Sequence, residues 1–304
     1  TASDFRADIR RVLRTIDSSP SSSSGPTRAR VATLRGWPLW PALAVVLLVL
    51  VSVGISYYNR PNKIVGPNWT AASRLQLTTQ PGTEFYPVLA PDGQNFVYAS
   101  NETGNYDLFM QRVGGKNSHP LTTNTPSDES QPVYSPNGER IAFRSTRQPA
   151  GVYVMERTGE NVRLVADNCQ HPAWSPDGKE IVCSTHGHPI PATRNTLPST
   201  LWVADVETGR KRLLCENDAM QPSWSPNGHR IAFWFMPPLA GRSDIATVAR
   251  DGTGIQVITN DASTNWNPVW SPDGKFLYFA SDRDGSMSFW RVPIDGQTGK
   301  VQGE

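Results

Sequence analysis

The segment Gln221–Gly228 reads QPSWSPNG, and this eight-residue pattern occurs five times in the chain. The other copies are YPVLAPDG at 86–93, QPVYSPNG at 131–138, HPAWSPDG at 171–178 and NPVWSPDG at 267–274. Successive copies begin 40 to 50 residues apart. A period of this length is typical of repeat architectures, in which each repeat forms one supersecondary unit.

The second half of each copy has the composition of a tight turn. Proline presets φ at the second turn position, Asp or Asn suits the third, and Gly accepts the positive φ that closes a hairpin. We therefore interpret five pairs as structural turn residues. They are Asp92 and Gly93, Asn137 and Gly138, Asp177 and Gly178, Asn227 and Gly228, and Asp273 and Gly274.

Short apolar runs surround each turn. One run follows every turn, as in Ile141–Phe143 and Phe276–Ala280, and is predicted to form a β-strand. A second strand-like run comes next, as in Gly151–Met155, and a third precedes most copies, beginning with Leu75–Thr78. One unit thus contains four antiparallel strands in about 45 residues, the size of a propeller blade. A β-sandwich also has many short strands, but it does not need to repeat its sequence.

The repeated signature resembles the TolB-like family of β-propeller repeats over about residues 75–293. The resemblance implies an all-β propeller of four-stranded blades, of which five repeats are visible. The last repeat has no outer strand, and Leu75–Thr79 has no earlier blade to join. We therefore expect an incomplete six- or seven-bladed ring that needs sequence beyond Glu304 to close.

The N-terminal region has a different composition, and we expect the sequence to be part of a longer protein. Residues 1–17 include a predicted amphipathic helix, and 1–13 resemble the closing helix of bacterial serine/threonine kinase domains. No Gly-rich phosphate loop, His-Arg-Asp loop or Asp-Phe-Gly motif is present, so the chemistry of such a kinase would precede Thr1. A juxtamembrane helix is the alternative interpretation.

A membrane span is predicted next. Residues 18–36 read as a Ser/Pro-rich flexible linker, and 39–58 contain no charged residue. About 20 apolar residues span a bilayer as a helix, and aromatic residues stand near both ends of this run. We predict a transmembrane helix at 37–58, a linker at 59–74 and the propeller at 75–304.

The orientation of this span decides the compartment of the propeller. Arginines on the N-terminal side favour a cytoplasmic N-terminus, with the propeller periplasmic or extracellular, in a single-pass protein of the inner membrane. A cleaved signal peptide is the alternative, but the region before the apolar run is too long for one. The formal net charge of +2 gives no reason to expect a nucleic-acid partner.

The three cysteines, Cys169, Cys183 and Cys215, fall in neighbouring predicted strands. An odd number leaves at least one cysteine free in an oxidising compartment. A Cys169–Cys183 bridge is one interpretation, and buried thiols are the one that we expect.

One polar position recurs just before the first proline of each copy. A propeller lines its central channel with the first strand of each blade, so these side chains could form a ring at the channel mouth. The ring would either bind a ligand or satisfy the backbone of neighbouring blades, and both interpretations stay open. Its members are Tyr86, Gln131, His171, Gln221 and Asn267.

Other candidate residues are assigned structural roles. Trp174, Trp224 and Trp270 occupy one repeated slot and are interpreted as packing between blades rather than as ligand-stacking residues. His186 and His188 lie in a Pro- and Thr-rich insertion without further metal ligands, so we expect no metal site. No Gly-x-Ser-x-Gly elbow or paired carboxylates suggest catalysis, and we expect neither a catalytic residue nor a cofactor in this chain.

The predicted order of segments along the chain is therefore a short cytoplasmic segment, a linker, one membrane span and an external propeller. The first functional hypothesis is a sensor or protein-interaction propeller of a transmembrane serine/threonine kinase, which binds an unknown protein or small molecule and could form a homodimer. The second is the sensor of a CadC-type transmembrane transcriptional regulator. The third is an envelope scaffold protein of the TolB type.

Overall fold

The computed structural model describes residues 75–122, 125–186, 198–237 and 241–303. The predicted N-terminal helix in 1–17 and the predicted membrane span at 37–58 lie outside these residues. Within the described ranges, no helix has the length and apolar character needed to cross a bilayer.

The described residues form five antiparallel sheets, each made of consecutive strands, and this confirms the predicted β-propeller fold. Blade 1 contains β1 (Glu84–Leu89), β2 (Asn95–Ser100), β3 (Asp107–Arg112) and β4 (Ser118–Pro120). Blade 2 contains β5 (Glu129–Tyr134), β6 (Arg140–Ser145), β7 (Gly151–Glu156) and β8 (Arg163–Asp167). Blade 3 contains β9 (Gln170–Trp174), β10 (Glu180–Ser184), β11 (Leu201–Asp205) and β12 (Lys211–Cys215). Blade 4 contains β13 (Ala219–Trp224), β14 (Arg230–Phe235), β15 (Asp244–Ala249) and β16 (Gln256–Val257). Blade 5 contains β17 (Asn265–Trp270), β18 (Phe276–Ser281) and β19 (Ser288–Pro293).

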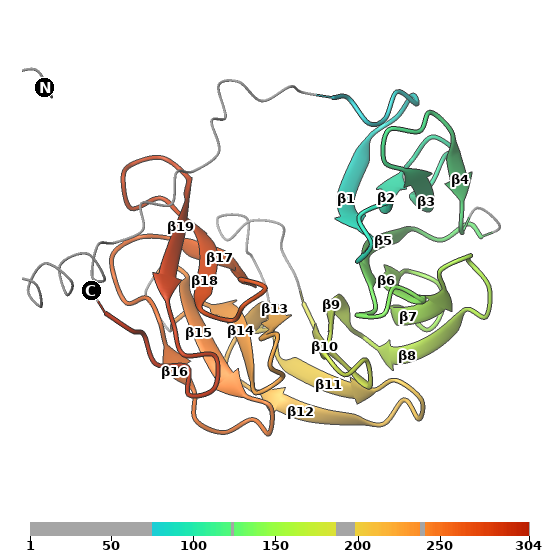
Figure 1. Cartoon of the computed structure of the whole chain (residues 1–304). Helices are drawn as coiled ribbons and strands as arrows, with labels where there is room; N and C mark the ends of the chain where they lie inside the picture. The colour runs from blue at the N-terminus through green and yellow to red at the C-terminus, as the bar shows by residue number, and fades with distance from the viewer. Residues whose placement is uncertain (1–74, 123–124, 187–197, 238–240, 304) are drawn as a thin grey trace, which may run out of the picture. The chain divides into compact units, whose positions relative to one another are not determined.

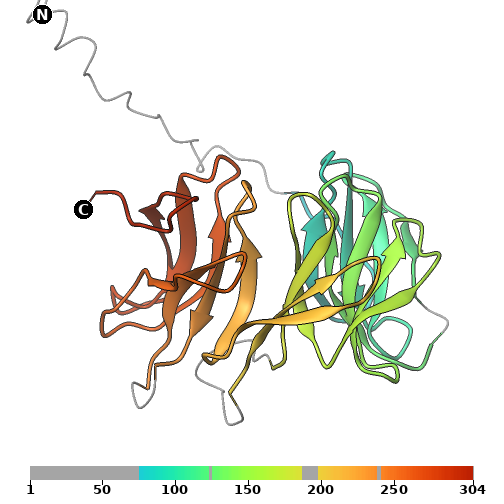
Figure 2. The same cartoon turned by 90° about the horizontal axis from the view of Figure 1, so that it is seen from below.

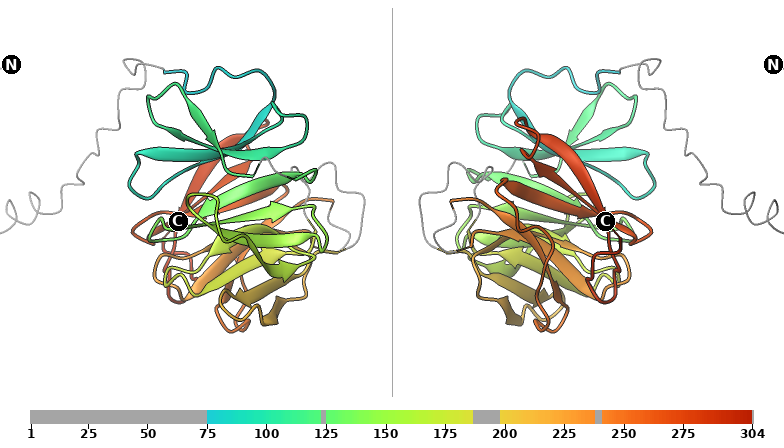
Figure 3. Two further views of the ribbon diagram at one scale, coloured as in Figure 1. Left: turned by 90° about the vertical axis from the view of Figure 1, so that its right-hand side faces the viewer. Right: turned by 90° about the vertical axis from the view of Figure 1, so that its left-hand side faces the viewer.

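The blades follow one another around a common centre. The first strands of successive blades are in contact, β1 with β5, β5 with β9, β9 with β13 and β13 with β17. Figure 1 shows the five blades as an open arc with blade 1 and blade 5 at its two ends. The sheets stand side by side when seen from below (Figure 2), and Figure 3 views the arc from its two sides.

Blade 5 has three strands, as expected, and after β19 only an isolated bridge joins Ile294 to Val301. The expectation of a strand at Leu75–Thr78 is wrong, because 75–80 have no regular secondary structure. An outer strand pairs with the third strand of its own blade, and the described residues contain no third strand ahead of blade 1. Leu77 instead packs against Phe96, Tyr98 and Phe109 on one side of blade 1.

The repeated turn is held by a repeated set of hydrogen bonds. Ser135 Oγ donates to Asn137 Oδ1 at 2.7 Å, and the backbone N–H of Glu139 donates to the same oxygen at 3.2 Å. The backbone N–H of Gly138, at φ 74°, donates to the Ser135 carbonyl at 2.8 Å. Equivalent bonds form at Asp177, Asn227 and Asp273. The turn chemistry therefore fixes the junction between the first and second strands of each blade.

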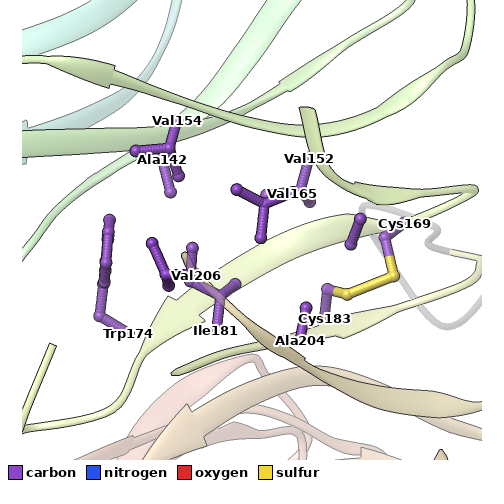
Figure 4. Packing of buried hydrophobic residues seen from close by; sticks show 11 residues of the cluster. Ala142, Val152, Val154, Val165, Cys169, Trp174, Ile181, Cys183, Ala204 and Val206 are labelled. Carbon is purple, nitrogen blue, oxygen red and sulfur yellow. A yellow bond between two sulfur atoms is a disulfide. The ribbon is translucent and has the colours of Figure 1, made fainter. Parts of the chain in front are cut away.

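The repeated tryptophan lies between neighbouring blades. Trp174 of β9 is 7% exposed and packs in one cluster with Ala142 of blade 2 (Figure 4). Its Nε1–H donates to the Val133 carbonyl of β5 at 3.2 Å, and the Arg140 guanidinium lies 5.4 Å from its ring centroid. A single side chain thus joins two sheets by apolar burial, a hydrogen bond and a cation–π contact.

The cysteine expectation is corrected by the structure. Cys169 and Cys183 form a disulfide with their Cα atoms 5.7 Å apart, and Cys215 is a buried free thiol. Figure 4 shows the disulfide at the edge of the cluster that contains Trp174. The bridge joins β10 to the residue that precedes β9, its antiparallel neighbour, so the sheet itself sets the Cα separation that a disulfide needs. The spacing of the two cysteines along the sequence does not by itself predict this strand register.

The tryptophan hydrogen bond offers a matched stability test. Trp174→Phe removes an indole N–H that donates across a blade boundary, whereas the indole N–H of Trp224 has no hydrogen-bond partner among the described residues. We expect Trp174→Phe to lower the free energy of unfolding by about 0.5–1.5 kcal/mol more than Trp224→Phe. Denaturant unfolding of both variants measures the difference, and equal losses would contradict the role assigned to this bond.

Candidate functional site

Every first strand carries a β-bulge at the same place. The pairing register with the second strand shifts between Phe85 and Val88 in β1 and between Ser130 and Val133 in β5. Equivalent shifts occur in β9, β13 and β17. Each bulge contains one residue of the predicted polar ring and the proline that follows it. Proline lacks the N–H that a regular ladder needs, so a bulge is a place where a strand tolerates it.

The bulge holds each ring residue in an unusual backbone conformation. The φ angles of Tyr86, Gln131, His171, Gln221 and Asn267 lie between 48° and 55°. Glycine adopts this left-handed region freely, whereas other residues are strained there, and such strain tends to collect at functional sites. All five positions nevertheless carry a side chain that can form hydrogen bonds. This combination favours a role for the side chains themselves.

The five ring residues line a single cavity. Its volume is about 570 Å³, and its lining also includes the prolines that follow them and Trp266. All five first strands contribute, so the cavity lies where the blades converge. The five residues of the predicted ring are therefore brought together around one cavity, and their hydrogen bonds show which side chains are already engaged.

Two ring members bind each other. The Gln131 Oε1 accepts the backbone N–H of His171 at 2.7 Å, which turns its amide nitrogen toward the imidazole Nε2, 3.1 Å away. The other imidazole nitrogen, Nδ1, lies 3.3 Å from Ser184 Oγ, which itself donates to the Gln170 carbonyl. The network is satisfied when His171 is neutral and carries its hydrogen on Nδ1. Gln131 and His171 thus connect blades 2 and 3.

The remaining ring members differ in whether their side chains form hydrogen bonds within the protein. Gln221 Oε1 accepts the indole N–H of Trp234 at 2.7 Å, within blade 4. Tyr86 is 44% exposed, and Asn267 is also exposed. Neither side chain forms a hydrogen bond with any described residue. The two ring side chains without a hydrogen bond to any described residue therefore belong to the first and last blades of the arc.

The electrostatics of the mouth keep His171 neutral. Burial, together with the smaller effect of the nearby positive charge of Arg144, lowers the pKa of its imidazole to about 4. The uncharged ring can then accept a hydrogen bond from Gln131. The structural bond between blades 2 and 3 is thus present at neutral pH.

Sequence reasoning missed the groups that anchor the first strands. Glu129, two residues before Gln131, is fully buried and accepts hydrogen bonds from Arg147 Nη2 at 2.9 Å and Ser145 Oγ at 2.8 Å. In blade 5 the equivalent bond joins Arg283 Nη2 to Asn265 at 3.0 Å. Arg147 and Arg283 each stand two residues after the second strand of their blade, and this recurrence was the signal available in the sequence. In the described ranges, no three His, Cys, Asp or Glu side chains form a group suited to a metal ion.

The lowered pKa of His171 predicts an acid-dependent loss of stability. Between pH about 6.5 and 4 the unfolded chain binds a proton that the folded chain does not, so the free energy of unfolding falls as pH falls through this window. His171→Gln should flatten this dependence by about 1–3 kcal/mol. Denaturant unfolding at several pH values measures the slope. A variant with an unchanged slope would show that another group causes it.

Comparisons with known proteins agree with this architecture. A family model described as the TolB beta propeller domain (PD40) matches residues 54–191 and 192–302. An uncharacterized protein of Agrobacterium fabrum is 27% identical over 162 residues, which are 42% of this chain and 55% of that protein. The chain therefore spans about half the length of this curated relative.

Solved structures share the fold at low sequence identity. A putative TolB from Agrobacterium tumefaciens superposes with a TM-score of 0.57 at 23% identity, over 73% of this chain and 80% of that one. TolB from Acinetobacter baumannii gives 0.56 at 17% identity, over 71% and 53%. An oligogalacturonate lyase in complex with manganese gives 0.55 at 14% identity, over 70% and 62%. The repeated turn, the blade order and the family match lead to one conclusion: this chain belongs to the TolB β-propeller (PD40) family.

Proposed function

We propose that this chain is the membrane-anchored, extracytoplasmic binding part of a transmembrane serine/threonine kinase, and that its propeller mouth binds an extended protein segment. The observation that carries the binding role is the cavity of about 570 Å³ with polar side chains on strained backbone around it. Prolines of the first strands supply apolar walls, and Tyr86 and Asn267 supply hydrogen-bonding groups. This mixture suits a peptide, which presents backbone amides along with side chains.

The disulfide supports the external location. Structural disulfides persist in oxidising compartments and are rare in a reducing cytosol. The Cys169–Cys183 bridge therefore fits a propeller outside the cytoplasm, reached through the apolar segment at 39–58. The resemblance of residues 1–13 to the closing helix of a kinase domain supports a catalytic domain on the opposite side of the membrane.

The TolB family membership supports a second candidate, a scaffold of the envelope that docks partner proteins without a kinase. A CadC-type regulator is a third arrangement with the same topology. The cytoplasmic domain of the full-length protein separates them, because the kinase proposal requires a catalytic loop and the regulator requires a winged helix. Both alternatives retain the binding role of the mouth.

The native disulfide can report the location of the propeller in cells. We expect acid-trapped alkylation to find Cys169 and Cys183 protected in the intact chain and alkylated in a variant that lacks 37–58, because only anchored export exposes them to oxidation. Mass spectrometry of the alkylated peptides gives the readout, and the free thiol of Cys215 serves as the internal control for alkylation. Free thiols at both positions in the intact chain would contradict an external propeller.

The mouth can be tested with a displayed library of random peptides as the probe. Peptides selected on the chain should lose at least tenfold in affinity for a Tyr86→Ala, Asn267→Ala variant, because these side chains have unused hydrogen-bonding groups. Leu213→Ala, an exposed position on the outer strand β12, is the matched control and should not change affinity. Peptides that bind both variants equally would show that binding occurs elsewhere.

A further inference from the structure

One partly buried arginine has no partner within the described part of the protein. Arg144 lies in β6, and its side chain forms no hydrogen bond, ion pair or ring contact with any described residue. Every other described arginine that is partly or fully buried has such a contact, as Arg147 has with Glu129. A cation that leaves water without a partner costs free energy, so the Arg144 guanidinium is a candidate ligand-binding group.

The Arg144 side chain faces blade 3. Alternate residues of a strand point to the same face, and Ala142 of β6 packs in the cluster that blades 2 and 3 share (Figure 4). After burial, the positive charge of Arg144 is the second cause of the lowered pKa of His171 in β9. Arg144 therefore belongs to a junction in the middle of the arc, where the structure contains the blades on both sides.

The same position carries satisfied polar groups in the next two blades. The strand register makes Ser184 of β10 and Trp234 of β14 equivalent to Arg144. Ser184 Oγ donates to the Gln170 carbonyl at 3.3 Å, and Trp234 Nε1–H donates to Gln221 Oε1 at 2.7 Å. Each of these groups is bonded within its own blade. The N–H groups of Arg144 remain available for a partner from outside.

Arg144 lines a cavity between blades 2 and 3, here called the junction cavity. Its volume is about 640 Å³, within the range of about 300–1,000 Å³ that is typical of small-molecule sites. Blade 2 supplies Arg144 and 150–151 to the lining, and blade 3 supplies 168–170 and 185–186. No residue lines both this cavity and the mouth, so the two are separate sites.

The lining of the junction cavity is positive. It contains Arg144 and His186 but no Asp or Glu among the described residues. Asp167, the residue before the lining segment 168–170, is bonded to Lys211 Nζ, so its charge is already balanced. A bound anion would therefore meet the Arg144 guanidinium without competition from a carboxylate of the lining.

Neutral donors surround the guanidinium. The Thr185 hydroxyl can donate to His186 Nδ1, 3.2 Å away, and this places the ring hydrogen on Nε2. The side-chain amides of Asn168 and Gln170 add further N–H groups, of which one from Gln170 donates to the Thr185 carbonyl at 3.4 Å. The lining thus offers donors of several kinds to an acceptor-rich ligand.

Apolar groups form the rest of the lining. Ala150 and Pro198 lie there with Cys169, whose disulfide to Cys183 ties this wall to β10. An apolar wall beside a guanidinium suits a carboxylate with a carbon skeleton, because the planar fork binds both oxygens while the skeleton contacts the wall. Inorganic phosphate would use the guanidinium and leave the apolar wall without a contact.

We propose that the junction cavity binds a small organic carboxylate, whose two oxygens accept hydrogen bonds from the Arg144 guanidinium. His186, Asn168 and Gln170 donate to the remaining polar groups of the ligand. The propeller then carries a cationic small-molecule site between blades 2 and 3 in addition to its uncharged mouth.

Calorimetric titration of the full-length chain in detergent micelles tests the proposal with three probes: sodium benzoate, sodium glutarate and inorganic phosphate. Arg144→Gln removes the charge from the junction cavity, and Arg144→Lys keeps the charge without the planar fork. Arg210→Gln is the matched control, because Arg210 is an exposed arginine in the turn after β11, outside the cavity. Melting followed by circular dichroism checks the fold of each variant.

We expect saturable binding of benzoate or glutarate, tighter than that of phosphate. Arg144→Gln should weaken this binding at least about tenfold, and Arg144→Lys should weaken it less. Arg210→Gln should leave it unchanged, and so should the Tyr86→Ala, Asn267→Ala variant, which alters only the mouth. Because Arg144 has no partner among the described residues, Arg144→Gln should also melt at the same temperature as the original chain.

Four results would overturn the proposal. One is the absence of saturable binding by either carboxylate. Another is equal affinity of the original chain and Arg144→Gln, which would place the binding elsewhere. Tighter binding of phosphate would exclude the assignment to carboxylates. A lower melting temperature of Arg144→Gln without any probe would show that the guanidinium already has a structural partner.

Discussion

Each blade is apolar on both of its faces, and this constraint governs the whole arrangement. Ile181 and Val182 are adjacent in β10 and point to opposite faces, yet both are 0% exposed because blades lie on either side. A sheet of this kind cannot stand alone in water, since about 25 cal/mol is lost for each Å² of apolar surface left exposed. The blades must therefore pack in series, as the buried clusters at the four junctions between described blades show.

The sequence predicted the features that depend on local chemistry. The Ser-Pro-Asp/Asn-Gly turns and the apolar runs beside them specify hairpins within a few residues, and their repetition specifies a blade. Prediction from the sequence failed where the structure depends on pairing between separate strands. The strand expected at Leu75–Thr78 needs a neighbouring strand that the described residues do not contain, and the Cys169–Cys183 bridge depends on the register between β9 and β10.

The sequence predicted which residues line the cavity, but it did not predict their backbone conformation or their hydrogen bonds. A polar residue before each first proline marked the ring, but a residue before proline is ordinarily extended, so nothing in the sequence indicated left-handed backbone at those positions. The hydrogen bonds also differ from blade to blade. Gln131, His171 and Gln221 are held by neighbouring groups, whereas Tyr86 and Asn267 are free at the two ends of the arc. Proteins as different as TolB and oligogalacturonate lyase share the fold, so the fold alone does not identify a ligand.

The common bulge has a consequence for how such a mouth diversifies. Because each bulge is set by the backbone and by the proline that follows, the residue on it can change without shifting the register of its blade. The side chain three residues later is a tryptophan in blades 3, 4 and 5, where it fills the space against the preceding sheet. The side chain at the bulge can therefore differ from blade to blade while the spacing of the five positions around the cavity stays constant.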